Sequence, residues 1–408
     1  MTEPAAIEGD TTFKSILSKV PEITLFFWII KVLCTTVGET AADFLNVNLN
    51  FGLTLTSVIM GVLFLVALFV QFRTQKYVPV VYWLTVMLIS VFGTLVTDNL
   101  SDNFHVPLEY TTVIFTLLLA ATFAVWYAKE KTLSIHSIFT PRREAFYWLT
   151  ILFTFALGTA SGDLMAESLG FGYLTTGLII ATTIALCAVA WRLGLNSILS
   201  FWIIYILTRP LGASIGDFLT QPQQNGGLGW GPTITTIVFI AGIIFSVIYL
   251  ALSHKDVVKD PMKEEREDTE HATHAVWHLV VVGTLLLAVS IGGYVYRHQQ
   301  LAQEIVTSPS GATGEVYPLG DLSNFTSLSN ATLAAVNTGD WATANAHVNE
   351  IEFAWDAAQA KLKPMNTQKW TEIDGDLDKV FREVRAVQPN QQTSKTALET
   401  LIRALQKP

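Results

Sequence analysis

The sequence has few charged residues and almost no cysteine. Only 14% of its 408 residues are charged, whereas charged residues make up about a quarter of an ordinary soluble domain. Its two cysteines, Cys34 and Cys187, both lie inside apolar runs, so a disulfide framework and a thiolate metal cluster are excluded. The net charge of −9 argues against a nucleic-acid partner, because nucleic acid is bound through clustered Lys and Arg.

The features of a secretory signal are also missing from the N-terminal segment. Residues 1–20 contain acidic and basic side chains, but they lack a short apolar core and a small-residue cleavage site. We therefore expect this segment to be cytoplasmic and the first apolar run to stay in the chain as an anchor.

Apolar residues make up 51% of the chain, which contains 11 Trp and 24 Phe. They form nine runs of roughly 18 to 23 residues, the length that crosses a bilayer as a helix. The runs lie near 23–45, 51–71, 79–98, 109–127, 145–163, 171–191, 197–217, 233–252 and 277–296. An open strand would leave polar backbone groups unpaired in lipid, so the sequence predicts an all-α integral membrane protein with the bilayer as its first partner.

Basic residues are confined to one set of connections between these runs. Four connections contain no Lys or Arg, and they lie at 46–50, 99–108, 164–170 and 218–232. The alternate connections hold Arg73, Lys129, Arg192 and Lys255, among others. Because Lys and Arg collect on the cytoplasmic side of a membrane, we expect a cytoplasmic N-terminus and an external segment after the ninth helix.

Four segments of the sequence align without gaps. Each reads aromatic, Trp, nine residues, Gly, four residues, Asp. The repeated residues are Trp28, Trp83, Trp148 and Trp202; Gly38, Gly93, Gly158 and Gly212; and Asp43, Asp98, Asp163 and Asp217. Such a recurrence at fixed spacing indicates tandem structural units.

This pattern resembles a family of bacterial membrane proteins built of four tandem repeats, each with two transmembrane helices and a characteristic Trp. The resemblance covers roughly residues 20–252 and implies the architecture and a place in the bacterial cell (inner, cytoplasmic) membrane, because the family is defined by its repeat and not by an activity. Each unit enters and leaves on one side, so we expect four parallel units packed around an axis, in a fourfold or a two-plus-two arrangement.

The expected organisation follows from these runs. It consists of a cytoplasmic segment at 1–20; an eight-helix repeat domain at 21–252, with repeats near 21–71, 77–127, 142–192 and 196–252; a charged cytoplasmic loop at 253–276; a ninth transmembrane helix at 277–296; a linker at 297–321; and an external small helical bundle at 322–408. We expect the repeated glycines to allow close helix packing. The repeated tryptophans fit an interfacial belt or buried packing equally well.

The repeated aspartates are candidate ion ligands. They fall at the C-terminal ends of the odd-numbered helices, where the helix dipole disfavours a negative charge. Three of them have a second carboxylate four residues away, and these partners are Glu39, Asp102 and Glu167. Four units around an axis would gather these groups into an acidic ring, which attracts cations. The alternative is solvated acidity in external loops.

Hydroxyl pairs early in the even-numbered helices, such as Thr56 with Ser57 and Thr235 with Thr236, are expected to add oxygen ligands. His and Cys are absent from the repeated pattern, so oxygen chemistry favours a hard ion such as Mg²⁺, Ca²⁺, Mn²⁺, Na⁺ or H⁺. The pattern does not choose among them, and it indicates no organic cofactor.

Two basic residues break the fourfold symmetry. Lys31 and Arg209 lie within apolar spans, where a cation is costly and usually pairs with a carboxylate. They are interpreted as counter-ions for Glu39 or the aspartates, or as movable charges that compete with a transported cation. Lys31 could instead extend toward the inner surface. Pro210 follows Arg209 and predicts a kink.

The remaining segments carry weaker signals. His271, His274 and His278 are spaced along one helical face, which is compatible with a metal or pH-sensing cluster, although a solvated lead-in helix is favoured. In the C-terminal bundle the carboxylates are interpreted as surface charge, and its apolar stripes as core.

Three classes of function fit the sequence unequally. Transport of a small cation ranks first. A membrane-anchored sensor or assembly factor, whose external bundle binds a protein partner, is the alternative. An enzyme is disfavoured because the HExxH motif is absent and the single GxSxG match, at residues 212–216, lies inside an apolar span.

Overall fold

The computed structural model describes residues 18–48, 51–104, 106–221, 227–257, 275–307, 319–386 and 388–406. All regular structure in these residues is helical. The histidines at 271 and 274, and the side chain of His278, lie outside the described part, as do most of the predicted loop at 253–276 and half of the predicted linker.

In the part of the chain that the structure describes, eight helices are long and apolar enough to cross a membrane, which confirms the eight predicted spans of the repeat region. They are α1 (Leu25–Asp43), α2 (Leu53–Arg73), α3 (Pro79–Asp98), α4 (Leu108–Glu130), α5 (Pro141–Asp163), α6 (Tyr173–Arg192), α7 (Ser197–Thr220) and α8 (Gly231–Ser253). We call them together the membrane unit.

Local sequence signals set where these helices begin and end. Thr140 accepts a hydrogen bond from the backbone N–H of Arg143 at the start of α5, as an N-cap residue does. Pro79 and Pro141 occupy the first turns of α3 and α5, where the missing N–H is harmless. Three spans end in a π-helical turn, namely η1 (Phe44–Asn48), η2 (Asn99–Asn103) and η4 (Leu164–Ser168).

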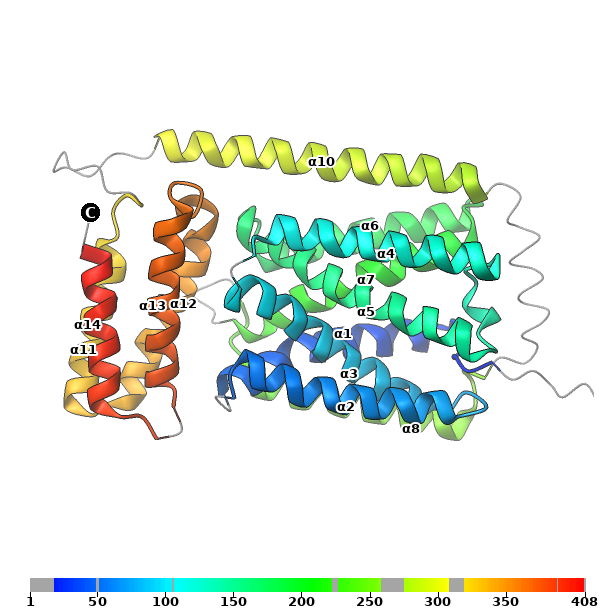
Figure 1. Cartoon of the computed structure of the whole chain (residues 1–408), viewed down its shortest axis with the longest axis horizontal. Helices are drawn as coiled ribbons and strands as arrows, with labels where there is room; N and C mark the ends of the chain where they lie inside the picture. The colour runs from blue at the N-terminus through cyan, green and yellow to red at the C-terminus, as the bar shows by residue number, and fades with distance from the viewer. Residues whose placement is uncertain are drawn as a thin grey trace, which may run out of the picture.

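The odd-numbered helices form an inner ring in the order α1, α3, α5, α7, with α7 closing on α1. The even-numbered helices surround this ring (Figure 1) and are mostly exposed. Each even helix packs most closely on the odd helix of the next repeat: α2 on α3, α4 on α5, α6 on α7, and α8 back on α1. The four repeats therefore close into a pseudo-fourfold assembly.

The repeated glycines lie where neighbouring odd helices touch. A Cβ at Gly93 would lie 2.7 Å from the Cβ of Phe155, and one at Gly158 would lie 2.5 Å from the Cβ of Arg209. The four contacts follow the ring, and they are Gly38 with Ser90, Gly93 with Phe155, Gly158 with Arg209 and Gly212 with Thr35. A side chain at any of these positions would push the ring apart.

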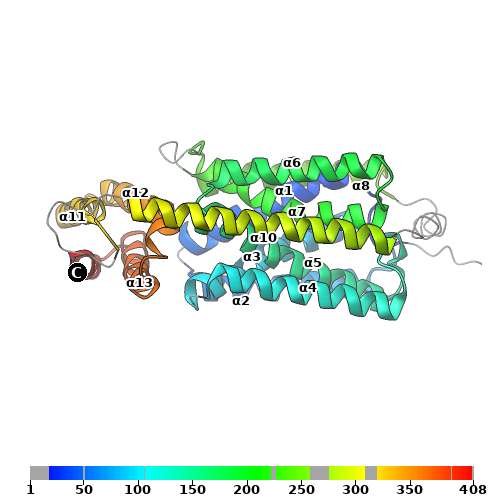
Figure 2. The same cartoon turned by 90° about the horizontal axis from the view of Figure 1, so that it is seen from above.

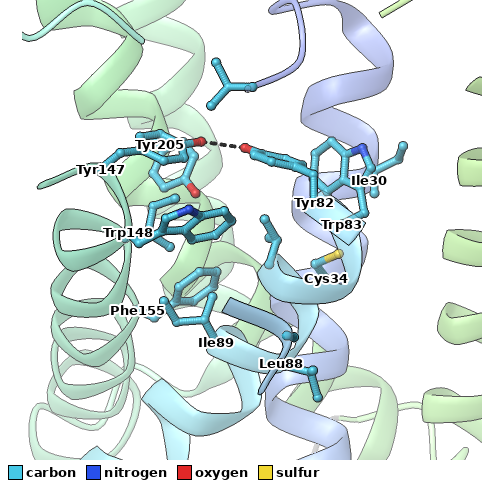
Figure 3. Close-up of a cluster of buried hydrophobic side chains, with 14 of the residues drawn as sticks. Ile30, Cys34, Tyr82, Trp83, Leu88, Ile89, Tyr147, Trp148, Phe155 and Tyr205 are labelled. Carbon is cyan, nitrogen blue, oxygen red and sulfur yellow. Dashed lines mark hydrogen bonds between the residues drawn. The ribbon is translucent and has the colours of Figure 1, made fainter. Parts of the chain in front are cut away.

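Aromatic side chains fill the end of the ring at which α1 begins (Figure 3). Trp83, Trp148 and Trp202 are buried, whereas Trp28 is partly exposed. The aromatic residues that precede these tryptophans, Phe27, Tyr82, Tyr147 and Phe201, are all buried. Packing therefore describes three of the four tryptophans better than an interfacial belt does.

A C-terminal helical region follows the membrane unit, as predicted. Helix α10 (Ala275–Thr307) runs along the outside of the membrane unit beside α4 and α6 (Figures 1 and 2). Four further helices form a bundle with its own apolar core, and they are α11 (Ser323–Thr338), α12 (Trp341–Leu362), α13 (Thr367–Val384) and α14 (Gln391–Gln406). This bundle lies at the end of the membrane unit that carries the π-helical turns (Figure 1). We call this end the bundle-side end.

Candidate functional site

The ring brings the four repeated aspartates to one place. Asp43, Asp98 and Asp163 are the last α-helical residues of α1, α3 and α5, just before the π-helical turns, while α7 continues past Asp217. All four line a single cavity at the bundle-side end. Because π-helical turns inside helices are frequent at functional sites, the repeated turns indicate that the functional site lies at this end of the ring.

The cavity has a volume of about 1900 Å³ and lies between the membrane unit and the bundle. The membrane unit contributes Glu39, Asp43, Asp98, Asp102, Asp163, Glu167 and Asp217, and the bundle contributes Glu350, Glu352, Asp356, Asp374 and Asp378. Lys363, Arg382 and Arg385 are the Lys and Arg residues on the described part of the lining. Acidic side chains therefore dominate both walls.

Glu39, Asp43 and Asp217 form the tightest carboxylate group. One oxygen from each lies within 4.8 Å of the others, and both Glu39 and Asp217 are buried. Two oxygens bound to one Ca²⁺-sized ion at about 2.4 Å are at most about 4.8 Å apart, so this spacing suits a single hard cation. Asp98 and Asp163 line the same cavity outside this group.

Arg209 forms the floor beneath the carboxylates. Its fully buried guanidinium donates through Nη2 to Glu39 Oε2 at 2.7 Å and to Thr159 Oγ1 at 2.7 Å. Nη2 also donates to Thr94 Oγ1, and Nη1 donates to the Thr35 carbonyl at 3.1 Å. These partners belong to α1, α3 and α5, so one side chain of α7 links all four inner helices.

Pro210 lies inside α7, which remains one helix from Ser197 to Thr220. The proline ring packs against α5, the preceding inner helix, because a Cβ at Gly158 would lie 2.9 Å from Pro210 Cδ, and one at Gly162 would lie 3.4 Å from its Cβ. The two glycines make room for the ring and for the stem of Arg209.

Lys31 is buried in the ring on the side of Arg209 away from the cavity. Its Nζ lies 3.8 Å from the Phe155 ring centroid and 4.0 Å from that of Tyr205. It forms no ion pair with Glu39 or the aspartates in the described part of the chain. Arg209 is thus the counter-ion of Glu39, while Lys31 neither takes that role nor reaches the surface, being 1% exposed.

The hydroxyl pairs of the even helices do not line this cavity, so they are not the additional ligands that the sequence suggested. Thr56 Oγ1 donates to the Gly52 carbonyl, and Thr235 Oγ1 donates to the Gly231 carbonyl. Thr236 Oγ1 donates to Thr40 Oγ1 on α1 at 2.8 Å. These three hydroxyls serve their own helix or a neighbour, as hydroxyls in helices commonly do, whereas Thr112 Oγ1 and Thr176 Oγ1 have no hydrogen-bond partner among the described residues.

The bundle carboxylates were predicted to be surface charge, and five of them instead face the membrane unit across the cavity. Burial raises the pKa of Asp356 well above its usual range, and Glu352 and Glu167 add to the effect. Reduced solvation, with Asp374 and Asp102 nearby, raises the pKa of Asp378 to about 7, although its side chain keeps contact with solvent. Carboxylates of the two parts therefore act on each other electrostatically.

A signal for these residues exists in the sequence. Glu352 and Asp356, and likewise Asp374 and Asp378, are four residues apart, the same spacing as the acidic pairs of the repeats. Arg385 Nη1 donates to Glu352 at 3.0 Å, and Trp355 Nε1 donates to Asp374 at 2.8 Å. The spacing predicts a shared helix face, but not that the face would be opposite another acidic surface.

Comparison with known proteins identifies the repeat. Four segments match the family described as Repeat of Unknown Function (DUF347), and they span residues 26–77, 81–132, 146–193 and 200–256. Each segment contains one odd helix and the even helix that follows it. No curated protein and no solved structure matches the chain.

Proposed function

This chain belongs to the DUF347 repeat family, and we propose that it transports a small hard cation across a bacterial cytoplasmic membrane. The observation that carries the proposal is the convergence of the four repeated aspartates, with Glu39, on one cavity at the end of the helical ring. Rings of carboxylates attract and select cations. Because the ligands offered are oxygens, the cargo is Mg²⁺, Ca²⁺, Mn²⁺, Na⁺ or H⁺.

The proposal includes an orientation. Arg73, Arg192 and Lys255 lie at the end opposite the bundle, and the positive-inside rule makes that end cytoplasmic. Helix α10 has 33 residues and is therefore about 50 Å long, enough to cross the bilayer beside the membrane unit as a ninth span. The bundle and the acidic cavity then face the outside, from which cations enter.

A sensor or assembly protein is the second candidate, and one observation favours it. Below Glu39 the centre of the ring holds the buried side chains of Arg209, Lys31 and Tyr205. These side chains occupy the centre of the ring, where a transported cation would have to pass. The arrangement therefore suits a protein that binds a cation outside and passes a signal through the bundle to a protein partner. Neither candidate function involves catalysis.

Cation flux into proteoliposomes separates the two candidates. We expect the parent to move at least one of the five cations and Asp43→Asn or Asp217→Asn to bind it at least about tenfold more weakly, equivalent to about 1.4 kcal/mol, because one anionic ligand is lost. Asp376→Asn is the matched control, since Asp376 pairs with the exposed Lys379 and lies outside the cavity lining.

Flux that is unchanged in both cavity variants would refute the carboxylate site. Binding without flux, weakened in the same two variants, would leave the site intact and favour the sensor.

A further inference from the structure

Lys31 is a buried amine without an ion-pair partner among the described residues. It is 1% exposed, and its Nζ has no hydrogen-bond acceptor there. The faces of the Phe155 and Tyr205 rings lie against this Nζ. Aromatic faces attract a cation but accept none of its three hydrogen bonds, so the charged form is weakly stabilised here.

A second buried lysine shows what full stabilisation looks like in this fold. Lys19 is 7% exposed, and its Nζ donates to Glu144 Oε2 at 2.6 Å and to the Phe72 carbonyl at 3.2 Å. Lys19 thus has a carboxylate partner. Lys31 lacks that anchor, and a small change in the local field decides whether its amine is charged.

The groups around Lys31 connect it to the cation site. Cys34 on α1 and Arg209 on α7 are the titratable or charged groups that act on it electrostatically, and the phenol of Tyr205 lies against it. Arg209 stays protonated, and its charge is offset by Glu39 through the 2.7 Å ion pair. A cation bound to Glu39, Asp43 and Asp217 would share that carboxylate and leave the charge of Arg209 less compensated.

We propose that Lys31 is the proton-carrying residue that couples cation binding to proton release. While Glu39 is paired with Arg209 alone, Lys31 holds its proton as an ammonium. When a cation also binds Glu39, the positive field of Arg209 and the cation at Lys31 increases. One N–H bond of Lys31 then breaks, which leaves the neutral amine with its lone pair and releases one proton. The net reaction exchanges a bound proton for a bound cation, and this coupling rests on the proposed transport function.

Tyrosine hydroxyls lie on the side of Lys31 away from the cavity, and none of them is hydrogen-bonded to its Nζ. The Tyr82 and Tyr147 hydroxyls form a hydrogen bond of 2.5 Å in the aromatic cluster that also contains Tyr205 (Figure 3). Farther along, the Tyr77 hydroxyl donates to Asp256 Oδ2 at 2.5 Å. A proton that leaves Lys31 in this direction moves away from Arg209 and toward the end of the membrane unit opposite the bundle.

The test measures Lys31 and cation binding in the same sample. The full chain in detergent, labelled with ¹³C at lysine Cε, is observed by NMR at constant pH with and without MgCl₂ or CaCl₂, while calorimetry records binding. The Lys31 signal is assigned by its loss in Lys31→Arg. We expect it to move from the ammonium to the amine position when the cation binds, and the Lys19 signal to stay at the ammonium position.

A pH-indicator dye in weak buffer gives the second readout. The parent should release about one proton per chain on cation binding, as linkage requires, whereas Lys31→Arg and Lys31→Met should bind the cation with little release. Two variants are used so that a folding defect in one does not decide the outcome. Two results would overturn this coupling and leave the cation site intact: cation binding with an unchanged Lys31 signal, or proton release in both variants equal to that of the parent. If neither Mg²⁺ nor Ca²⁺ binds, the proposed coupling of Lys31 to these ions is refuted. The transport proposal is tested separately by cation flux in proteoliposomes.

Discussion

At the residue scale, Glu39 and Arg209 are where the four repeats stop being equivalent. The residue after the repeated glycine is Glu39 in the first repeat but Thr94 and Thr159 in the second and third. Arg209 of the fourth repeat binds all three of these side chains. Three equivalent positions of the repeats, occupied by Glu39, Thr94 and Thr159, thus bind one guanidinium.

Breaking this pair should be costly. Arg209→Gln leaves Glu39 buried without its counter-ion, and such a loss is worth about 3–5 kcal/mol in buried pairs. The double variant Arg209→Gln with Glu39→Gln removes both charges and should recover much of the stability. Thermal unfolding in detergent provides the double-mutant cycle.

The surface pair of Lys395 with Glu399 is the control, because both side chains are exposed and such pairs contribute at most about 1 kcal/mol. Additive effects of the Arg209 and Glu39 substitutions would show that the two side chains are not coupled.

At the element scale, the ring depends on where helices can approach. Each repeated glycine touches the next inner helix, and each even helix covers the inner helix of the following repeat. No repeat therefore covers its own inner helix, because each odd helix is covered by the even helix of the preceding repeat.

Gly93→Ala tests this packing. The added methyl group would lie 2.7 Å from Phe155 Cβ, and such overpacking typically costs about 1–3 kcal/mol. Gly292→Ala in α10 is the control, since no atom lies within 4 Å of the position where its Cβ would be. The midpoint of thermal unfolding should fall for the first variant only. An equal fall in both would mean that loss of glycine itself, not the approach of α3 to α5, sets the effect.

The sequence predicted the spans and the recurrence well because both depend on composition and spacing. It did not predict which helices touch: α2 and α4 have similar apolar surfaces, and lipid and protein neighbours accept the same side chains. The two interpretations of the tryptophans stayed open for that reason. Thr56 and Thr235 were expected to be ligands, yet their own backbone carbonyls satisfy them, which spacing alone cannot reveal.

At the scale of the whole molecule, two acidic surfaces enclose one cavity. Five carboxylates of the bundle face seven of the membrane unit across it, so negative charges of the two parts lie opposite each other. The pKa of Asp378 is about 7, above the ordinary value for Asp. The folded protein therefore holds this proton more tightly than the unfolded chain does, and the resulting stability is full in acid and is lost as the pH rises through about 7.

The same rise in pH should favour a cation. Each carboxylate that loses its proton adds a negative charge to the cavity, and a bound cation offsets the repulsion between the two walls. Because Asp378 keeps contact with solvent, water and salt screen its share of the effect. The proposed cation site accordingly includes the carboxylates of the bundle.

Locating a bound cation tests the central claim most directly. Crystals of the full chain soaked in MnCl₂ at pH 8 should give an anomalous difference peak among Glu39, Asp43 and Asp217, where three carboxylate oxygens lie within 4.8 Å of one another. The peak should weaken at pH 5.5 as protons compete, and it should be lost in Asp217→Asn. Anomalous peaks confined to exposed acidic side chains, with none at these three residues at either pH, would contradict the account.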